Sequence, residues 1–202
     1  LPTYQIELEG PDLAVSPGAH SQANLKIENV GTEKDRYSIE VTGLPQGWVR
    51  AERMEVDVEA GAKEQTVLTF KPLRRSESQP GEYPVVVRVR SNSNSSQVIE
   101  APTTLRVLPY SGFGIALGEA RVNDSVKVYV HNQGNVPLSL LMEGTDKEHA
   151  LRYNLGAPQV TLAPGEYKTL TGTIQSRRRK LFGPEQEYEF AIQARANNAA
   201  GF

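Results

Sequence analysis

Apolar and polar residues alternate with a period of two along most of this chain. The alternation is clearest in Tyr4 to Glu9, Met54 to Glu59 and Val126 to Val130. A period of two places successive side chains on opposite faces of a strand, so one set faces a core and the other faces water. No stretch has the spacing of an amphipathic helix, and Asp146 to Arg152 could supply only a single helical turn. The pattern therefore predicts an all-β chain.

Glycine and proline separate the alternating stretches, as in Ser16-Pro17-Gly18, Pro80-Gly81 and Pro164-Gly165. These are turn residues, and short strands with turns at regular spacing are typical of a β-sandwich. In the first half the predicted strands are 4–9 with 13–15, 23–28, 36–41, 54–58, 64–71, 82–90 and 97–107. In the second half they are 113–117, 125–131, 137–143, 159–162, 167–175 and 186–196.

One motif occurs twice. Asn29-Val30-Gly31 follows a predicted strand, and Asn132-Gln133-Gly134 follows another 103 residues later. The turn at Gly61 has a counterpart 104 residues on at Gly165. Two landmarks with nearly the same offset indicate a duplicated domain. We therefore predict two immunoglobulin-like β-sandwiches in tandem, covering residues 1–109 and 110–202, joined by a short linker near Pro109.

The second copy ends before its last predicted strand. In the first copy the strand that ends near Arg90 is followed by a loop and the strand 97–107, whereas the equivalent strand of the second copy ends near Ala196. The unpaired sheet edge that this predicts has three alternative explanations. The chain is a segment of a longer protein, the first strand of the domain covers the edge, or a partner supplies the missing strand.

Composition limits the chemistry. The 202 residues carry a net charge of −2 and contain no cysteine, which excludes disulfides, thiol nucleophiles and thiolate metal sites. Neither half is basic enough to predict nucleic-acid binding, and no stretch is apolar enough to predict a transmembrane segment. The histidines, His20, His131 and His149, are not spaced as paired metal ligands. We predict no cofactor and no metal site.

The first half resembles a known family. It reads Val15-Ser16-Pro17-Gly18, Asn29-Val30-Gly31 and Gly43-Leu44-Pro45-Gln46-Gly47-Trp48, then Ala60-Gly61 and Pro80-Gly81-Glu82-Tyr83. This is similar to the bacterial Ig-like domain found beside alpha-galactosidases and in uncharacterised membrane-associated proteins. The resemblance spans residues 5–107, and the second half departs from it, with Leu151 to Leu155 in place of the Gly-Leu-Pro-x-Gly-Trp segment. It implies an accessory module in an extracytoplasmic or membrane-associated bacterial protein, with no catalytic motif.

Two basic segments form the sharpest local feature. Arg177, Arg178, Arg179 and Lys180 follow one predicted strand, and Arg74 and Arg75 occupy the matching place in the first copy. Such a loop is ordinarily kept polar by water alone. The functional alternative is contact with an anionic surface, an acidic polymer or an acidic partner, since each basic residue near an anionic membrane contributes about 1 kcal/mol.

Trp48 is the only tryptophan, and a lone tryptophan in a sandwich is normally a core residue. The alternative is an exposed platform for a sugar, which would need further aromatic rings such as Tyr37 and Tyr83 in the same plane. Tyr83 has a structural alternative, in which its hydroxyl bonds to a neighbouring loop.

The function that we expect is non-catalytic. No Gly-x-Ser-x-Gly motif, calcium loop or paired buried carboxylates can be identified, so we predict no catalytic residues. The leading hypothesis is a spacer or protein-interaction scaffold within a larger bacterial protein, with neighbouring domains or a partner strand as the contact. The alternative is a carbohydrate or cell-wall binding module, and a hydrolase is the least favoured.

Overall fold

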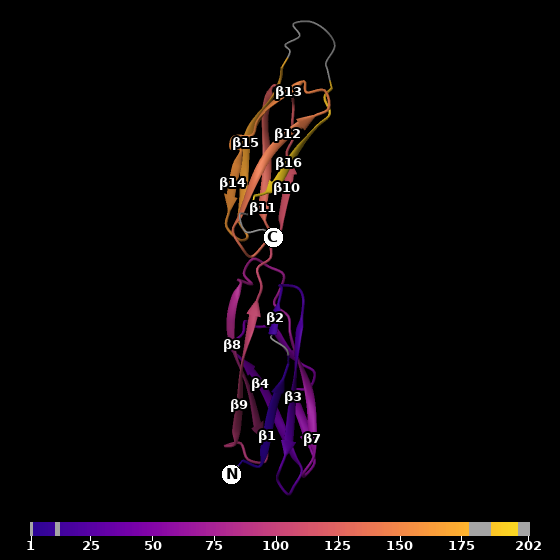
Figure 1. Ribbon diagram of the computed structural model, residues 1–202, viewed down its shortest axis with the longest axis vertical. Helices are drawn as coiled ribbons and strands as arrows, with labels where there is room; N and C mark the ends of the chain where they lie inside the picture. The colour runs from indigo at the N-terminus through magenta and orange to yellow at the C-terminus, as the bar shows by residue number, and fades with distance from the viewer. Residues whose placement is uncertain (1, 11–12, 178–186, 198–202) are drawn as a thin grey trace. The chain divides into compact units, whose positions relative to one another are not determined.

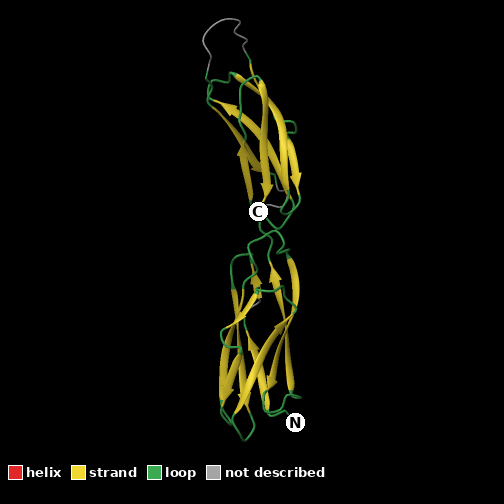
Figure 2. Cartoon of the chain, turned by 180° about the vertical axis from the view of Figure 1, so that it is seen from behind, coloured by secondary structure: helices red, strands yellow, loops and turns green. Residues whose placement is uncertain are grey.

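A computed structural model describes residues 2–10, 13–177 and 187–197. The chain divides into two compact units, the first comprising Leu1–Arg74 with Ser78–Pro109 and the second Arg75–Glu77 with Tyr110–Phe202. Every regular element in the described ranges is a strand (Figure 2). Each unit is a sandwich of two sheets, so the prediction of tandem immunoglobulin-like β-sandwiches is confirmed.

The described residues of the first unit form nine strands, most of which are labelled in Figure 1. They are β1 (Tyr4–Glu9), β2 (Leu13–Val15), β3 (Ser21–Asn29), β4 (Asp35–Thr42), β5 (Val49–Ala51), β6 (Glu55–Val58), β7 (Lys63–Phe70), β8 (Gly81–Ser91) and β9 (Val98–Val107). One sheet has the order β1-β3-β7-β5 and the other has the order β2-β9-β8-β4-β6. All pairs are antiparallel except β2 with β9, which are parallel. The first strand is thus split, with β1 in one sheet and β2 in the other.

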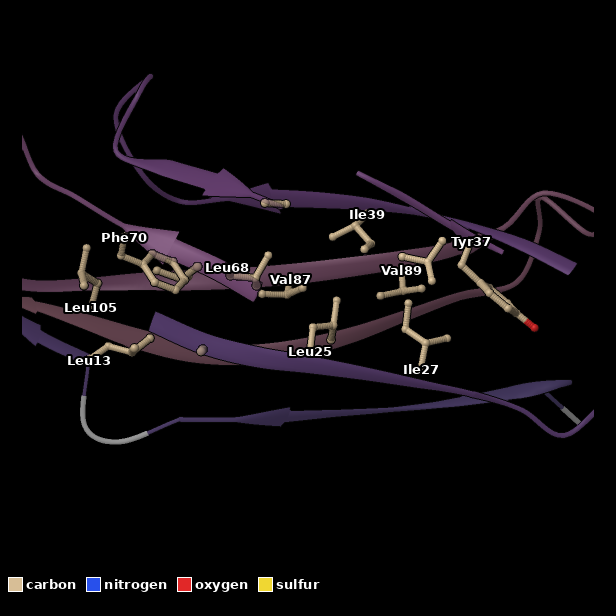
Figure 3. Close-up of a cluster of buried hydrophobic side chains, with 14 of the residues drawn as sticks. Leu13, Leu25, Ile27, Tyr37, Ile39, Leu68, Phe70, Val87, Val89 and Leu105 are labelled. Atoms are coloured by element: carbon tan, nitrogen blue, oxygen red, sulfur yellow. The ribbon is translucent and has the colours of Figure 1, made fainter. Parts of the chain in front are cut away.

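The core of the first unit lies between these sheets, where side chains from the two inner faces meet (Figure 3). Leu25 and Ile27 on β3 face Val87 and Val89 on β8, and all four are fully buried. Every second residue of each strand points inward, as the alternation predicts. Burial of this apolar surface is the main favourable term in folding.

The described residues of the second unit form seven strands. They are β10 (Phe113–Leu117), β11 (Asp124–Asn132), β12 (Leu138–Asp146), β13 (Leu151–Asn154), β14 (Gln159–Leu162), β15 (Tyr167–Ser176) and β16 (Phe190–Ala196). One sheet has the order β10-β11-β15-β13, which repeats β1-β3-β7-β5 strand for strand. The other has the order β14-β12-β16, which repeats β6-β4-β8. Within the described residues, no strand of the second unit takes the place of β2 or β9.

Candidate functional site: an open side of the second unit

One edge of β16 has no neighbouring strand in the part of the chain that the structure describes. The ladder of β16 runs to β12, from Leu140 opposite Ala196 to Asp146 opposite Phe190. The equivalent strand of the first unit, β8, pairs with β4 on one side and with β9 on the other. An unpaired edge presents a row of backbone donors and acceptors to its surroundings.

The inward side chains of β16 are less covered than those of β8. Ile192 lies opposite Gly144 of β12, at the same place in the ladder as Val87 opposite Val41 of β4. This register equates Phe190, Ile192 and Ala194 with Val85, Val87 and Val89. The three valines are at most 1% exposed, whereas the three residues of β16 are only half-buried.

The first strand of the second unit shows the same loss of cover. Ile115 pairs with Val130 and Leu117 with Val128, so both side chains face the inside of the sandwich. They are nevertheless 38% and 43% exposed. Their counterparts on β1, Ile6 and Leu8, pack against the core of the first unit. Apolar residues on an inner face become exposed when the opposite sheet does not extend over them.

The two exposed rows border one place in the fold. In the first unit β1 lies beside β9, across the gap between the sheets. The place equivalent to β9 in the second unit therefore lies between β10 and β16. β10 pairs with β11 in the opposite sheet, so the first strand does not cover the edge of β16. We call the edge of β16 together with Ile115 and Leu117 the open side.

The chemistry of the open side suits an extended peptide. Backbone groups along β16 can pair with an added strand, and the apolar side chains behind that strand would receive every second residue of it. On the outward face, Gln193 and Arg195 are the counterparts of Arg88 and Arg90 on β8. In the first unit the Nε of Arg88 donates to a carboxylate oxygen of Glu100 on β9 at 2.6 Å. By this register a residue of an added strand at the place of Glu100 would lie opposite Gln193, and one at the place of Val98 would lie opposite Arg195.

Perturbed titratable groups have structural causes. Burial opposes ionisation of Asp35, but hydrogen bonds from Ser91, Ser93 and the Arg36 N–H outweigh it and lower the pKa of the Asp35 carboxyl. Burial, and then a hydrogen bond to Asp146, raise the pKa of Tyr153 to about 12.

Within the described residues, no three His, Cys, Asp or Glu side chains are grouped as a metal site would require. Nor does any helix there have the length and apolar character needed to cross a membrane.

The basic loops stay a prediction. Arg74 and Arg75 are exposed, whereas Arg177 donates from its Nε to the Leu151 carbonyl at 2.8 Å. The remaining basic residues of the run, Arg178, Arg179 and Lys180, lie outside the described residues. Contact with an anionic partner thus rests on the sequence alone.

Trp48 and its predicted partners do not form an exposed platform. Trp48 is 4% exposed and Tyr37 is fully buried. The Tyr83 ring packs on Trp48 with centroids 5.1 Å apart, and its hydroxyl donates to the Gln79 carbonyl at 2.8 Å. Trp48 and Tyr37 are thus core residues, and the half-buried Tyr83 packs on Trp48 instead of joining a row of exposed rings.

No protein-family model matches the chain, and no curated protein matches it in sequence. The resemblance to the domain found beside alpha-galactosidases therefore has no further support, whereas the immunoglobulin-like sandwich is shown by the sheets themselves.

Several solved structures share the sandwich architecture at low similarity. A protein of unknown function from Porphyromonas gingivalis W83 is 17% identical over 85% of this chain and 82% of its own, with a TM-score of 0.40. The YadV chaperone is 11% identical over 98% and 95%, with a TM-score of 0.33. A PapD-like domain of human CEP192 is 16% identical over 50% and 82%, with a TM-score of 0.32. Scores this low carry no information about ligand or partner.

Proposed function

We propose that this chain is a non-catalytic module of two immunoglobulin-like domains that acts as a spacer and protein-interaction scaffold. Its interaction site is the open side, which receives one further strand. We place the module in a larger bacterial protein outside the cytoplasm, in keeping with the sequence resemblance. The observation that carries the proposal is the exposure of the inward-facing residues Ile115 and Leu117 beside the unpaired edge of β16.

The first unit supplies the template for the added strand. β9 pairs antiparallel with β8 over ten residues, from Gly81 opposite Val107 to Arg90 opposite Val98. Near the C-terminal end of β9, the inward side chains of Leu105 and Val107 are at most 2% exposed. A strand that binds the open side would likewise run antiparallel to β16 and carry apolar residues at every second position. Main-chain hydrogen bonds would contribute affinity, and the alternate apolar side chains would contribute specificity.

A graft tests whether the open side accepts a strand. Residues 92–107, the loop and strand that complete the first unit, are fused after Ala196 at the same spacing that they have after Ser91. Covering Ile115, Leu117 and the inner face of β16 should raise the melting temperature of the second unit by several degrees. It should also protect the amides of β16 from hydrogen exchange.

The matched control carries Ile99→Asp and Ala101→Asp in the grafted copy only. These inward positions lie opposite Val89 and Val87 in the first unit and would lie opposite Ala194 and Ile192 in the graft, so the backbone is kept while the apolar contacts are lost. The proposal expects stabilisation by the first graft and little or none by the control. Equal melting temperatures for the grafted and ungrafted proteins, with unchanged exchange in β16, would show that the open side does not accept a strand.

A further inference from the structure

The outer face of one sheet differs between the two units in a way that points to a ligand. The ladders equate Lys26, Glu28 and Lys63 of the first unit with Tyr129, His131 and Tyr167 of the second. On the neighbouring edge strand they equate Gln5 and Glu7 with Gly114 and Ala116. Because equivalent strands carry both sets of residues, the two faces differ in their side chains and not in their strand arrangement.

In the first unit this face carries charges that pair with one another. Lys26 Nζ lies 2.5 Å from a carboxylate oxygen of Glu9 and 3.9 Å from one of Glu7. Lys63 Nζ lies 2.9 Å from a carboxylate oxygen of Glu28. Exposed ion pairs contribute little to stability, but they are the ordinary way for a sheet to face water.

In the second unit aromatic rings stand in place of these ion pairs. The rings of His131 and Tyr167 stack with centroids 3.6 Å apart and planes only 9° from parallel. Tyr167 is 74% exposed and Tyr129 is 46% exposed. A cross-strand aromatic pair stabilises a sheet only modestly, whereas neighbouring exposed rings form an apolar patch of the kind that marks a binding site.

A hollow lies beside the rings, and the equivalent place in the first unit also holds one, of about 730 Å³, so the two units differ in the chemistry of the lining. Gly114 lies opposite His131 and Ala116 opposite Tyr129, so the edge strand does not cover these rings. The hollow of the second unit has a volume of about 260 Å³ and is lined by both small residues, the three rings and Thr169 among others. A Cβ placed on Gly114 would lie 3.1 Å from Gln133 Nε2, so a side-chain amide borders the hollow.

We propose that this aromatic row, Tyr129, His131 and Tyr167 with Gly114 and Ala116, binds a neutral carbohydrate by stacking on its pyranose rings. The electron-rich face of an aromatic ring complements the C–H groups of a sugar, and this preference needs no charge on the ligand. The residues that line the hollow include no carboxylate and one lysine, Lys168, whose Nζ donates to the Thr161 carbonyl at 2.9 Å and lies 3.4 Å from a carboxylate oxygen of Glu166. The Thr169 hydroxyl and the Gln133 amide are placed to bond sugar hydroxyls.

The size of the row favours a sugar over a protein partner. The five residues of the row and Thr169 occupy two outward positions on each of three strands. They span roughly 10 Å across the sheet and 7 Å along it, given the ordinary strand and residue spacings. Each partner in a stable protein interface contributes about 800 Å², a far larger area. The row matches the footprint of one or two sugar rings. Its rings stand on the outer face of the sheet, whereas the open side uses the inner face, and Ile115 of the edge strand borders both.

The test measures retention of the whole chain on microcrystalline cellulose, chitin and purified peptidoglycan, followed by titration with cellohexaose and chitohexaose. In Tyr129→Lys and Tyr167→Lys, each tyrosine is replaced by the lysine that stands at the equivalent position of the first unit, so the fold should tolerate both changes. Each should weaken binding by roughly tenfold, the loss expected for one aromatic contact. Lys127→Ala, two residues from Tyr129 on the same face, should leave binding unchanged.

Circular dichroism and melting curves establish that the variants are folded. Retention on at least one polysaccharide that both tyrosine variants lose would support the proposal. It would be overturned by the absence of retention on all three polysaccharides, or by equal retention of every variant. A protein partner that depends on Tyr167 without any polysaccharide retention would also overturn it and make the row a protein interface.

Discussion

Asn29 and Asn132 make the same hydrogen bonds in the two units. The Nδ2 of Asn29 donates to the carbonyls of Glu33 and Val58, and that of Asn132 donates to the carbonyls of Val136 and Leu162. Each Oδ1 accepts from the N–H of the glycine two residues later. Both side chains are at most 1% exposed. Each asparagine therefore ties the end of one strand to a turn of the opposite sheet.

Replacing either asparagine with alanine should unfold its own unit more easily. Asn29→Ala or Asn132→Ala leaves buried carbonyls and an N–H without partners, at an expected cost of about 2–3 kcal/mol. Urea unfolding, with each unit followed by its own amide signals, measures the loss. Asn24→Ala, an exposed asparagine on the strand of Asn29, should change the free energy of unfolding by less than about 0.5 kcal/mol. A cost that small for Asn29→Ala would refute the structural role.

The rings of Tyr37 and Tyr4 pack on each other in the first unit, with centroids 4.7 Å apart. The Tyr4 hydroxyl donates to the Val89 carbonyl at 2.6 Å, whereas the buried Tyr37 hydroxyl has no partner within the described residues. Burial raises the pKa of Tyr37 to about 12. Tyr37→Phe should leave the first unit equally stable or up to about 1 kcal/mol more stable, while Tyr4→Phe should cost about 1 kcal/mol. Equal losses in thermal unfolding for the two variants would contradict this difference.

Asp35 should make the first unit sensitive to acid. Its pKa is lower in the folded state than the ordinary value of about 4, so its contribution to stability is present above that value. The contribution is lost as the pH falls from that value through the folded pKa, because over this range the unfolded chain binds the proton more readily than the folded unit does. Urea midpoints measured from about pH 7 to about pH 2 should therefore fall less steeply for Asp35→Asn than for the native chain. Identical acid slopes would show that the carboxylate does not contribute.

Ile115 and Ile6 occupy equivalent positions with different cover. Ile115→Ala should lower the free energy of unfolding by about 0.5 kcal/mol, because folding removes only part of this side chain from water. Ile6→Ala should lower it by about 1.5–2 kcal/mol, because Ile6 packs against the core. Thermal unfolding of each unit gives both values. If Ile115→Ala costs as much as Ile6→Ala, then Ile115 is covered in solution and the open side is closed.

The period-two alternation was sufficient to predict most of the strands, because a half-buried strand leaves that signature. It missed β5 and β13, which have only three and four residues and therefore show barely one period. The repeated Asn-x-Gly predicted the duplication, but the hydrogen bonds that explain it join segments about 30 residues apart and are visible only in the fold.

The candidate sites were harder to predict. Tyr129 lies in an alternating stretch that is typical of an ordinary half-buried strand, and nothing local to it indicates that Tyr167 stacks on His131 across the sheet. The exposure of Ile115 depends on the absence of a covering strand among the described residues of the opposite sheet, which is a property of topology. For Trp48, the sole tryptophan, the sequence left both a core position and a sugar platform open, and its ring lies in the core.

Hydrogen exchange along β16, compared with β8 in the same sample, tests the open side most directly. β8 pairs on both sides from Val86 to Arg90 and should be protected throughout that range, whereas every second amide of β16 should exchange at rates close to those of an unpaired strand. The account predicts this alternating pattern between Phe190 and Ala196. Uniform protection of β16, equal to that of β8, would mean that its outer edge is already paired and would contradict the proposed interaction site.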